Sequence, residues 1–343
     1  MGTLNLIIKN SQPIFIDWAI TTKCHLNCVH CRYFRPSKDK QQKIKELSHR
    51  QAIDLAKQLN KISPQWILIE GGEPFLRADI FEIIEILKPA VNRNNIPIYI
   101  ISSGMDFNQQ LAEKCQQINV KLMISVDSSV PKTYEQIRQG ANYQTMIKAI
   151  EIAQSYNLLD SINVTLQPLN YSTGEIDALG KFAFANNIRR INFLGFKPNR
   201  AQAKGILPTT NYNKVFDTIA NISEQYQINV QVDEPFFNAW TKKMNYKIKK
   251  SPQAQGPIVA EEKLGCIFGE YLFIEPDGLL KPCSFSPLSY NEIGLTTIKS
   301  IRDKTNRKGK CGKCQYQLIC GGCRVRTFML TGDWHQSDPF CPL

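Results

Sequence analysis

Short apolar runs alternate with amphipathic segments over the first two-thirds of the chain. The apolar runs predict strands, and the segments between them repeat apolar residues with the spacing of helices. Regular alternation of strand and helix is typical of a parallel α/β sheet. The predicted strands are 14–18, 66–70, 96–102, 121–127, 161–167 and 190–196, and the predicted helices are 48–61, 80–92, 108–117, 143–157 and 176–185.

The pattern changes near residue 211. A helical stretch and a short strand at 228–232 precede a basic segment at 247–257, whose Pro, Gln and Gly residues indicate a linker. Six strands are too few for a closed barrel of eight β–α units. The sequence therefore predicts an open α/β domain, followed by a smaller region without the regular alternation of strand and helix.

Composition narrows the class of protein. Of 343 residues, 43% are hydrophobic, and no uncharged apolar run reaches the length of about 18 residues that a bilayer requires. The N-terminus lacks the layout of a signal peptide, so we expect a soluble, cytoplasmic protein with no membrane partner. The net charge of +12 fits either a solvated basic face or attraction to an acidic substrate or partner. Nucleic acid is not expected, because the basic runs lack interleaved aromatic residues.

The eleven cysteines carry the strongest chemical signal. Without a secretion signal, clustered cysteines favour metal or cluster ligation over disulfides. Cys24, Cys28 and Cys31 form a C-x3-C-x2-C pattern directly after the first predicted strand, where barrel folds place their chemistry. Three thiolates can hold three irons of a cubane cluster and leave the fourth iron open to a small molecule.

This pattern resembles the radical S-adenosylmethionine (radical SAM) family. The resemblance implies a partial (β/α)6 TIM barrel, a [4Fe-4S] cluster whose open iron binds SAM, and cleavage of SAM to a 5′-deoxyadenosyl radical. His30 stands where the family usually has an aromatic residue. Arg32 displaces a tyrosine, which follows here as Tyr33.

A glycine-rich turn follows the second predicted strand and matches the family motif that meets the SAM amino group. Two glycines let the backbone approach a ligand closely, although such a turn is also a common loop. Polar residues at later strand ends are candidates for the SAM ribose or carboxylate, and capping of the next helix is their alternative role. The implied SAM-binding residues are Gly71, Gly72, Glu73, Pro74, Ser103, Ser125, Asp127 and Gln167, together with His30.

The tail carries seven cysteines whose spacing resembles the SPASM extension of some radical SAM enzymes. That resemblance implies two auxiliary clusters, one held by Cys266, Cys283 and Cys323 and the other by Cys311, Cys314, Cys320 and Cys341. Three [4Fe-4S] clusters would then be present. The alternative is one structural zinc site made by the two C-x2-C pairs, Cys311/Cys314 and Cys320/Cys323. The implied domains are an N-terminal extension (1–12), a radical SAM barrel (13–232), a linker (233–265) and a SPASM domain (266–343).

The resemblance implies an oxidoreductase that receives electrons from a flavodoxin or ferredoxin. Its first expected substrate is a peptide or protein side chain, matured by crosslinking, dehydrogenation or decarboxylation, with a separate recognition protein. The alternative substrate is a tetrapyrrole of haem or haem d1 biosynthesis. Non-enzymatic alternatives are an iron–sulfur electron carrier and a zinc-stabilised RNA-binding protein. Asp277 and Glu275 are candidate general bases. Arg324 and Arg326 could hold substrate carboxylates, or they could have structural roles beside a cluster.

Overall fold

The computed structural model describes residues 4, 7, 15–32, 44–92, 96–195, 212–245 and 265–343. These residues divide into two compact units. The first contains residues 1–125, 138–159 and 269–295, and the second contains residues 126–137, 160–268 and 296–343. Most of the predicted extension (1–12) and part of the predicted linker (233–265) lie outside the described residues.

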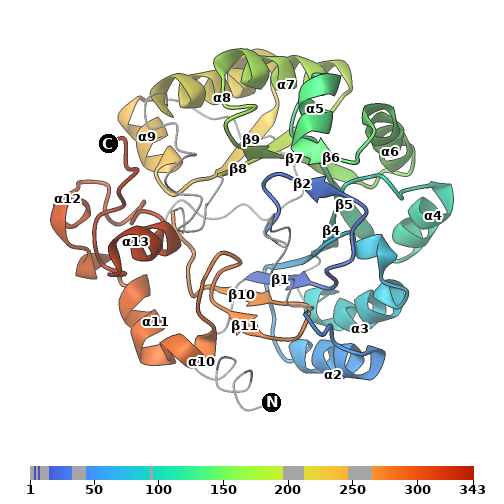
Figure 1. Ribbon diagram of the computed structural model, residues 1–343, viewed down its shortest axis with the longest axis horizontal. Coiled ribbons are helices and arrows are strands. Elements are labelled where there is room, and N and C mark those ends of the chain that lie inside the picture. Colours follow the sequence, from blue (N-terminus) through green and yellow to red (C-terminus); the bar gives the residue numbers. More distant parts are fainter. Residues whose placement is uncertain are drawn as a thin grey trace. The chain divides into compact units, whose positions relative to one another are not determined.

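A mostly parallel sheet forms the centre of the first unit. Its strands run in the order β11-β10-β1-β3-β4-β5, and only β11 is antiparallel to its neighbour. Helices α2, α3 and α4 line one side of this sheet (Figure 1). The strands are β1 (Phe15–Ala19), β3 (Trp66–Glu70), β4 (Ile98–Ser102), β5 (Val120–Ser125), β10 (Tyr271–Ile274) and β11 (Leu280–Lys281).

The helices of the first unit follow the predicted pattern. In α2, Ala52, Ala56 and Leu59 recur at helical spacing and are fully buried. Ser48 begins this helix with a capping box, in which its side chain and that of Gln51 each bond the other's backbone. The described helices of this unit are α2 (His49–Leu59), α3 (Ile80–Asn92), α4 (Gln109–Gln117), α6 (Tyr143–Ser155) and α10 (Tyr290–Ile293).

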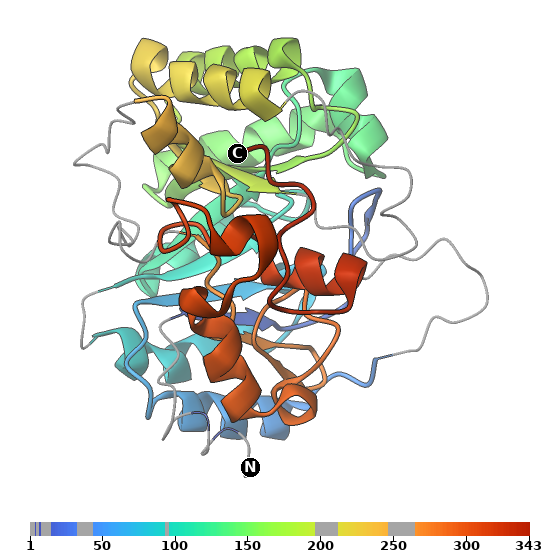
Figure 2. The ribbon, with the colours of Figure 1, turned by 90° about the vertical axis from the view of Figure 1, so that its left-hand side faces the viewer.

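The second unit has its own parallel strands, in the order β7-β8-β9. Helices α7 and α8 pack side by side in this unit (Figure 2). The strands are β7 (Leu159–Leu166), β8 (Arg190–Gly195) and β9 (Asn229–Asp233). The helices are α5 (Pro131–Ile137), α7 (Thr173–Ala185), α8 (Tyr212–Tyr226), α9 (Phe237–Lys243), α11 (Leu295–Arg302), α12 (Gly309–Gly312) and α13 (Arg324–Thr331).

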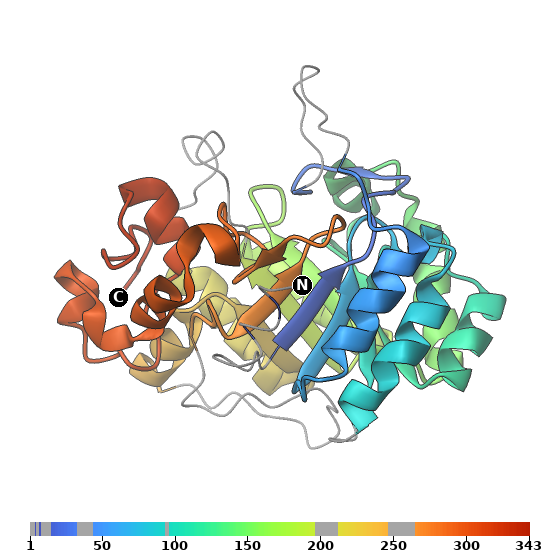
Figure 3. The same cartoon turned by 90° about the horizontal axis from the view of Figure 1, so that it is seen from below.

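The six strands and five helices predicted before residue 211 all appear, with ends displaced by a few residues. The helix and the strand predicted after residue 211 appear as α8 and β9. The sequence did not predict β10, which comes from the cysteine-rich region and pairs in parallel with β1 (Figure 3). It also missed the short helix α5 and the two-residue pair of β2 (Asn27–Cys28) with β6 (Arg138–Gln139). No described helix is both long and apolar enough to cross a bilayer.

Candidate functional site

The three N-terminal cysteines follow β1 on a loop that includes β2. Cys24 is exposed, Cys31 is half-buried, and Cys28 is buried in β2. Hydrogen-bond donors face two of the sulfurs, because the Leu26 amide lies 3.4 Å from Cys24 Sγ and the Arg138 guanidinium lies 3.8 Å from Cys28 Sγ. Such donors stabilise thiolates and tune the metal group that the thiolates hold. The loop therefore fits the predicted cluster.

Gly71 and Gly72 pack directly against this cysteine loop. The Gly72 amide donates to Thr21 O at 2.7 Å, and the Glu73 amide donates to Lys23 O at 2.7 Å. A Cβ atom on Gly71 would lie 2.4 Å from Thr21 O, and one on Gly72 would lie 2.1 Å from Lys23 O. The structure thus explains why glycines are needed at these two positions. Their backbone lies so close to the base of the cysteine loop that a side chain would not fit. The sequence did not show this reason.

Substitution of Gly72 by alanine is expected to displace the cysteine loop. The new methyl group would overlap the Lys23 carbonyl, and two backbone segments would have to separate. We expect a destabilisation of about 1–3 kcal/mol and a loss of cluster iron after anaerobic reconstitution. Gly174 offers the control, because a Cβ there meets no atom within 4 Å. Normal iron content in Gly72→Ala would contradict this account.

The Glu73 carboxylate is buried and holds the end of β4. It accepts hydrogen bonds from Ser102 Oγ at 2.8 Å, from the Ser103 amide at 2.9 Å and from Ser103 Oγ at 2.6 Å. Burial raises the pKa of Glu73, and these three hydrogen bonds oppose that rise. Glu73 and Ser103, both predicted to meet SAM, are thus brought together and bond each other. Pro74 starts a short 3-10 turn after Glu73, and Ser125 is buried at the end of β5.

In the second unit, Asp127 and Gln167 are joined through Asn170, which the sequence did not single out. Asp127 Oδ1 accepts from the Thr165 amide at 2.6 Å, and the Asn170 side chain donates to Asp127 O at 2.7 Å. The Gln167 amide donates to Asn170 Oδ1 at 2.8 Å. Gln167 Nε2 is buried and has no partner among the described residues. A buried donor of this kind fits a ligand that offers an acceptor.

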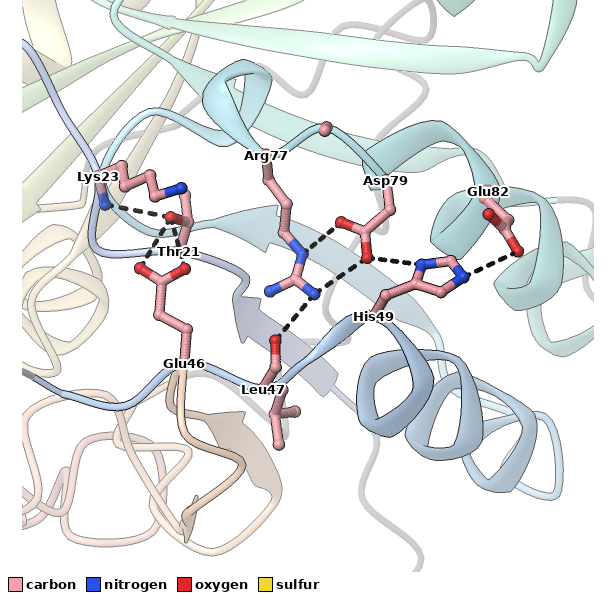
Figure 4. Close-up of a pocket in the computed structure, with 9 residues that line it drawn as sticks. Thr21, Lys23, Glu46, Leu47, His49, Arg77, Asp79 and Glu82 are labelled. Atoms are coloured by element: carbon pink, nitrogen blue, oxygen red, sulfur yellow. Dashed lines mark hydrogen bonds and ion pairs between the residues drawn. The ribbon is translucent and has the colours of Figure 1, made fainter.

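A polar cavity of about 530 Å³ lies at the base of the cysteine loop (Figure 4). Glu46 accepts from the Thr22 amide at 2.7 Å and from the hydroxyls of Thr21 and Thr22. Burial raises the pKa of Glu46, but these hydrogen bonds outweigh it and the net pKa is lowered. Arg77 donates to Ile20 O at 2.8 Å and to Leu47 O at 3.1 Å. Glu46 and Arg77 therefore brace the loop, although neither belongs to a motif.

Four tail cysteines surround one small cavity in the second unit, and they are Cys311, Cys314, Cys320 and Cys341. Amides point at two of the sulfurs, from Tyr316 to Cys314 Sγ and from Gly322 to Cys320 Sγ, each at 3.4 Å. Burial raises the pKa of Cys320 to about 12, and nearby Cys341 and Cys311 add to this. These are the four cysteines that the resemblance assigns to the second auxiliary cluster, and their ligation of a cluster stays a prediction. In the zinc alternative, Cys323 would take the place that Cys341 has here.

The other proposed auxiliary ligands do not fall in one unit. Cys283 belongs to the first unit, whereas Cys266 and Cys323 belong to the second. Their grouping into one cluster therefore stays a prediction. Among the described residues, no group of three or more Cys, His, Asp or Glu side chains has the spacing of a single-ion site. Cys115 is buried in α4, and burial raises its pKa to about 12.

The contacts of Arg324 and Arg326 favour the structural one of their two expected roles. Arg326 is buried and donates to both carboxylates of Glu234 and Asp338. Arg324 is fully buried, and its guanidinium donates to the carbonyls of Gly322, Trp334 and Gln336. All three nitrogens of the Arg326 guanidinium are thus engaged inside the second unit, whereas Arg324 Nη2 is buried without a partner among the described residues. These contacts stabilise the tail.

The two candidate bases differ in their surroundings. Asp277 is exposed on the turn between β10 and β11, where its carboxylate accepts from the Leu279 amide at 2.9 Å. It therefore acts as a turn cap. Glu275 is buried at the end of β10 and pairs with Lys281 at 2.7 Å. His30 is half-buried in the turn between Cys28 and Cys31.

Comparison with known proteins identifies the domain that contains the three N-terminal cysteines. Residues 18–183 match the model of the radical SAM superfamily. The chain contains a radical SAM domain. It is an enzyme, and a radical SAM domain carries a [4Fe-4S] cluster and binds SAM. The alternatives of a bare electron carrier and an RNA-binding protein are therefore set aside.

The chain is similar to a heme synthase and, over part of its length, to a maturase. An AdoMet-dependent heme synthase of Methanosarcina barkeri is 24% identical over 98% of both chains. Mycofactocin maturase MftC of Mycobacterium ulcerans is 23% identical over 50% of this chain and 44% of that protein.

Solved structures share the fold. SuiB of Streptococcus suis, bound to S-adenosylmethionine, superimposes with a TM-score of 0.67 at 17% identity, over 100% of this chain and 79% of that one. anSMEcpe with bound AdoMet superimposes with a TM-score of 0.67 at 15% identity, over 95% of this chain and 93% of that one. The predicted partial-barrel fold is confirmed.

Proposed function

We propose that this enzyme uses radical SAM chemistry to oxidise a C–H bond in a peptide or protein side chain. Cys24, Cys28 and Cys31 would hold a [4Fe-4S] cluster that, when bound and reduced, converts SAM to a 5′-deoxyadenosyl radical. Gly71 to Pro74 would shape the SAM site beside these cysteines. Ser103, Ser125, Asp127 and Gln167 would offer polar groups to SAM, and the buried Gln167 amide supports this assignment.

The tail cysteines would serve electron transfer. Four thiolates around one cavity leave no iron of a cubane open, so a cluster there would carry electrons only. We further propose that Cys266, Cys283 and Cys323 hold a third cluster. A flavodoxin or ferredoxin would supply the reducing electron. A separate protein would present the peptide.

Cations that are already paired, among the described residues, favour a peptide as the substrate. Arg32 pairs with Glu70, Lys281 pairs with Glu275, and Arg326 pairs with two carboxylates. A substrate with several carboxylates would need guanidinium or ammonium groups that are open to it. Carboxylates are instead abundant beside β1, β3 and β10. A neutral or cationic side chain suits these surroundings better than a polycarboxylate does.

A tetrapyrrole of haem or haem d1 biosynthesis is the second candidate. The full-length match to a heme synthase favours it, because the maturase match covers only half of this chain. The chemistry would then be oxidative decarboxylation or another side-chain modification. The positive net charge of +12 also suits a substrate with several carboxylates.

The experiment that tests this proposal measures 5′-deoxyadenosine from the reconstituted, dithionite-reduced enzyme. Two probes are compared, a casein digest and an iron porphyrin that retains its propionates. Stimulation by the digest, with peptides that lose two hydrogens in mass spectra, supports peptide oxidation. Stimulation by the porphyrin alone moves the assignment to the second candidate. Failure to cleave SAM under any condition contradicts both.

A further inference from the structure

A basic segment adjoins the cavity of the four tail cysteines in the second unit. Of the fifteen residues from 299 to 313, seven are Lys or Arg and one, Asp303, is acidic. Lys310 is one of the residues that line the cavity. The aliphatic stem of Lys304 lies beside another lining residue, Gly321, where an added Cβ atom would be 3.4 Å from Lys304 Cγ. Positive charge is therefore concentrated where the sequence predicts a cluster.

Two exposed cations of this segment, Lys310 and Lys313, have no partner among the described residues. Arg307 is 7% exposed and donates hydrogen bonds to three backbone carbonyls. Lys308, by contrast, pairs with Asp333. The segment thus keeps a net positive charge, which attracts an acidic partner and speeds its approach.

The cysteine set reaches the surface of the second unit beside these lysines. Cys314 and Cys341 are half-buried. Leu318, which follows Cys314 on the loop to the next cysteine, is 63% exposed. The Leu318 carbonyl accepts a hydrogen bond from Lys304 Nζ at 2.6 Å, so the basic segment holds this loop directly. An apolar side chain with charged residues around it is a common composition of a protein–protein interface.

We propose that this surface, made by Lys310, Lys313 and Leu318, docks an acidic one-electron carrier protein of the ferredoxin or flavodoxin class. The inference rests on the proposed function and adds the place where the electron from substrate oxidation leaves the enzyme. A substrate carbon radical that closes a double bond or a crosslink releases one electron and one proton. The proton passes to water. The oxidised carrier gains one electron from the group that the four cysteines would hold, and no bond forms or breaks in that transfer.

The same charge could attract nucleic acid, but the described residues favour a carrier protein. No Phe, Tyr or Trp stands between residues 299 and 313, whereas proteins bind single-stranded nucleic acid through aromatic side chains combined with cations. A carrier must also come close to the electron donor, and the basic segment lies beside the cysteine cavity. Complexes of electron carriers have small, weak interfaces, which suits a surface of this extent.

Binding of a carrier to the reconstituted full chain tests this surface without turnover. The probe is a plant-type [2Fe–2S] ferredoxin, which is acidic, and cytochrome c serves as a basic carrier for comparison. At low salt the wild type should bind the ferredoxin and should not bind cytochrome c. The double variant Lys310→Glu/Lys313→Glu should slow association with the ferredoxin on the order of 10–10³-fold. The double variant Lys310→Arg/Lys313→Arg should retain the wild-type rate, because it keeps both charges.

The matched control changes net charge by the same amount elsewhere in the second unit. Lys132 and Lys214 are exposed and do not line the cysteine cavity, so Lys132→Glu/Lys214→Glu should leave association with the ferredoxin near the wild-type rate. Equal slowing by this control would overturn the proposal, as would tighter binding of cytochrome c or of a uridine oligonucleotide. If the glutamate variant at the cavity loses iron, the wild type alone decides, because its affinity for the ferredoxin must fall between about 0.01 M and about 1 M salt.

Failure of this inference and failure of the proposed function give different results. A wild type that does not bind the ferredoxin has no such docking surface, and peptide oxidation still stands. A wild type that cleaves no SAM contradicts the proposed function, and the binding measurement still decides whether the surface recognises an acidic carrier.

Discussion

Replacing Cys28 by serine is expected to abolish SAM cleavage while the tail cysteines keep their metal. A cubane held at three corners loses a third of its protein ligands in this variant, and the hydroxyl of serine is a poor substitute for a thiolate. The Cys28 sulfur is buried in β2 and lies 3.8 Å from the Arg138 guanidinium. We expect iron content to fall by about four atoms per chain.

The measurement combines iron and sulfide analysis with chromatography of 5′-deoxyadenosine after dithionite reduction. Cys115→Ser is the matched control, because Cys115 is equally buried but sits on α4, away from the cysteine loop. It should keep its iron and its activity. If Cys28→Ser still cleaved SAM at a substantial fraction of the wild-type rate, the assignment of the N-terminal site would be wrong.

Local sequence patterns predicted the strands and helices of the α/β core because each element is specified by residues close together in the chain. Strand β3 has the sequence WILIE, and its apolar run predicts a buried strand without knowledge of its neighbours. Strand β10 was missed for the opposite reason. Its partner β1 lies about 250 residues earlier, and no local pattern predicts a strand pairing over that distance in sequence.

The candidate site could be predicted where the spacing of the cysteines indicates a cluster. The triad and the tail cysteines have spacings that imply clusters, and the structure places four of the tail cysteines around one cavity. Residues that support the site have no such spacing. Glu46 and Arg77 are ordinary charged residues in the sequence, and only the fold brings them beside the cysteine loop. Arg32 was noticed as a departure, but its ion pair required the structure.

A buried ion network in the second unit holds the tail together. Arg326 on α13 donates to Glu234 at 2.7 and 3.0 Å and to Asp338 at 2.5 and 2.9 Å. Asp338 also accepts from the Cys323 amide at 2.8 Å, so the network reaches a predicted cluster ligand. All three charged side chains are at most 5% exposed. Removal of one member of a buried ion network lowers the free energy of unfolding strongly, because it leaves an uncompensated charge in the protein interior.

Substitution of Arg326 by methionine is therefore expected to destabilise the protein strongly. Methionine keeps much of the side-chain volume but leaves the carboxylates of Glu234 and Asp338 buried without their cation. Breaking a buried pair from one side costs about 3–5 kcal/mol. The measurement is the free energy of unfolding in denaturant, under anaerobic conditions with the clusters in place. Lys308→Met removes an exposed ion pair with Asp333 and should cost less than about 1 kcal/mol.

The pH dependence of this loss of stability distinguishes a contribution of the ion network from a contribution of side-chain packing. Burial raises the pKa of Asp338, but the charge and hydrogen bonds of Arg326 outweigh it, so the folded pKa lies below the ordinary value. A group with a lowered folded pKa stabilises the protein above its unfolded pKa of about 3.9 and loses that contribution as pH falls through the folded pKa. Without Arg326, burial dominates, the pKa of Asp338 rises, and the acid becomes neutral on mild acidification. The loss in free energy of unfolding caused by Arg326→Met should therefore become smaller between neutral pH and about pH 5. A loss that stays constant over this range would contradict this account and assign the effect to packing of the Arg326 stem.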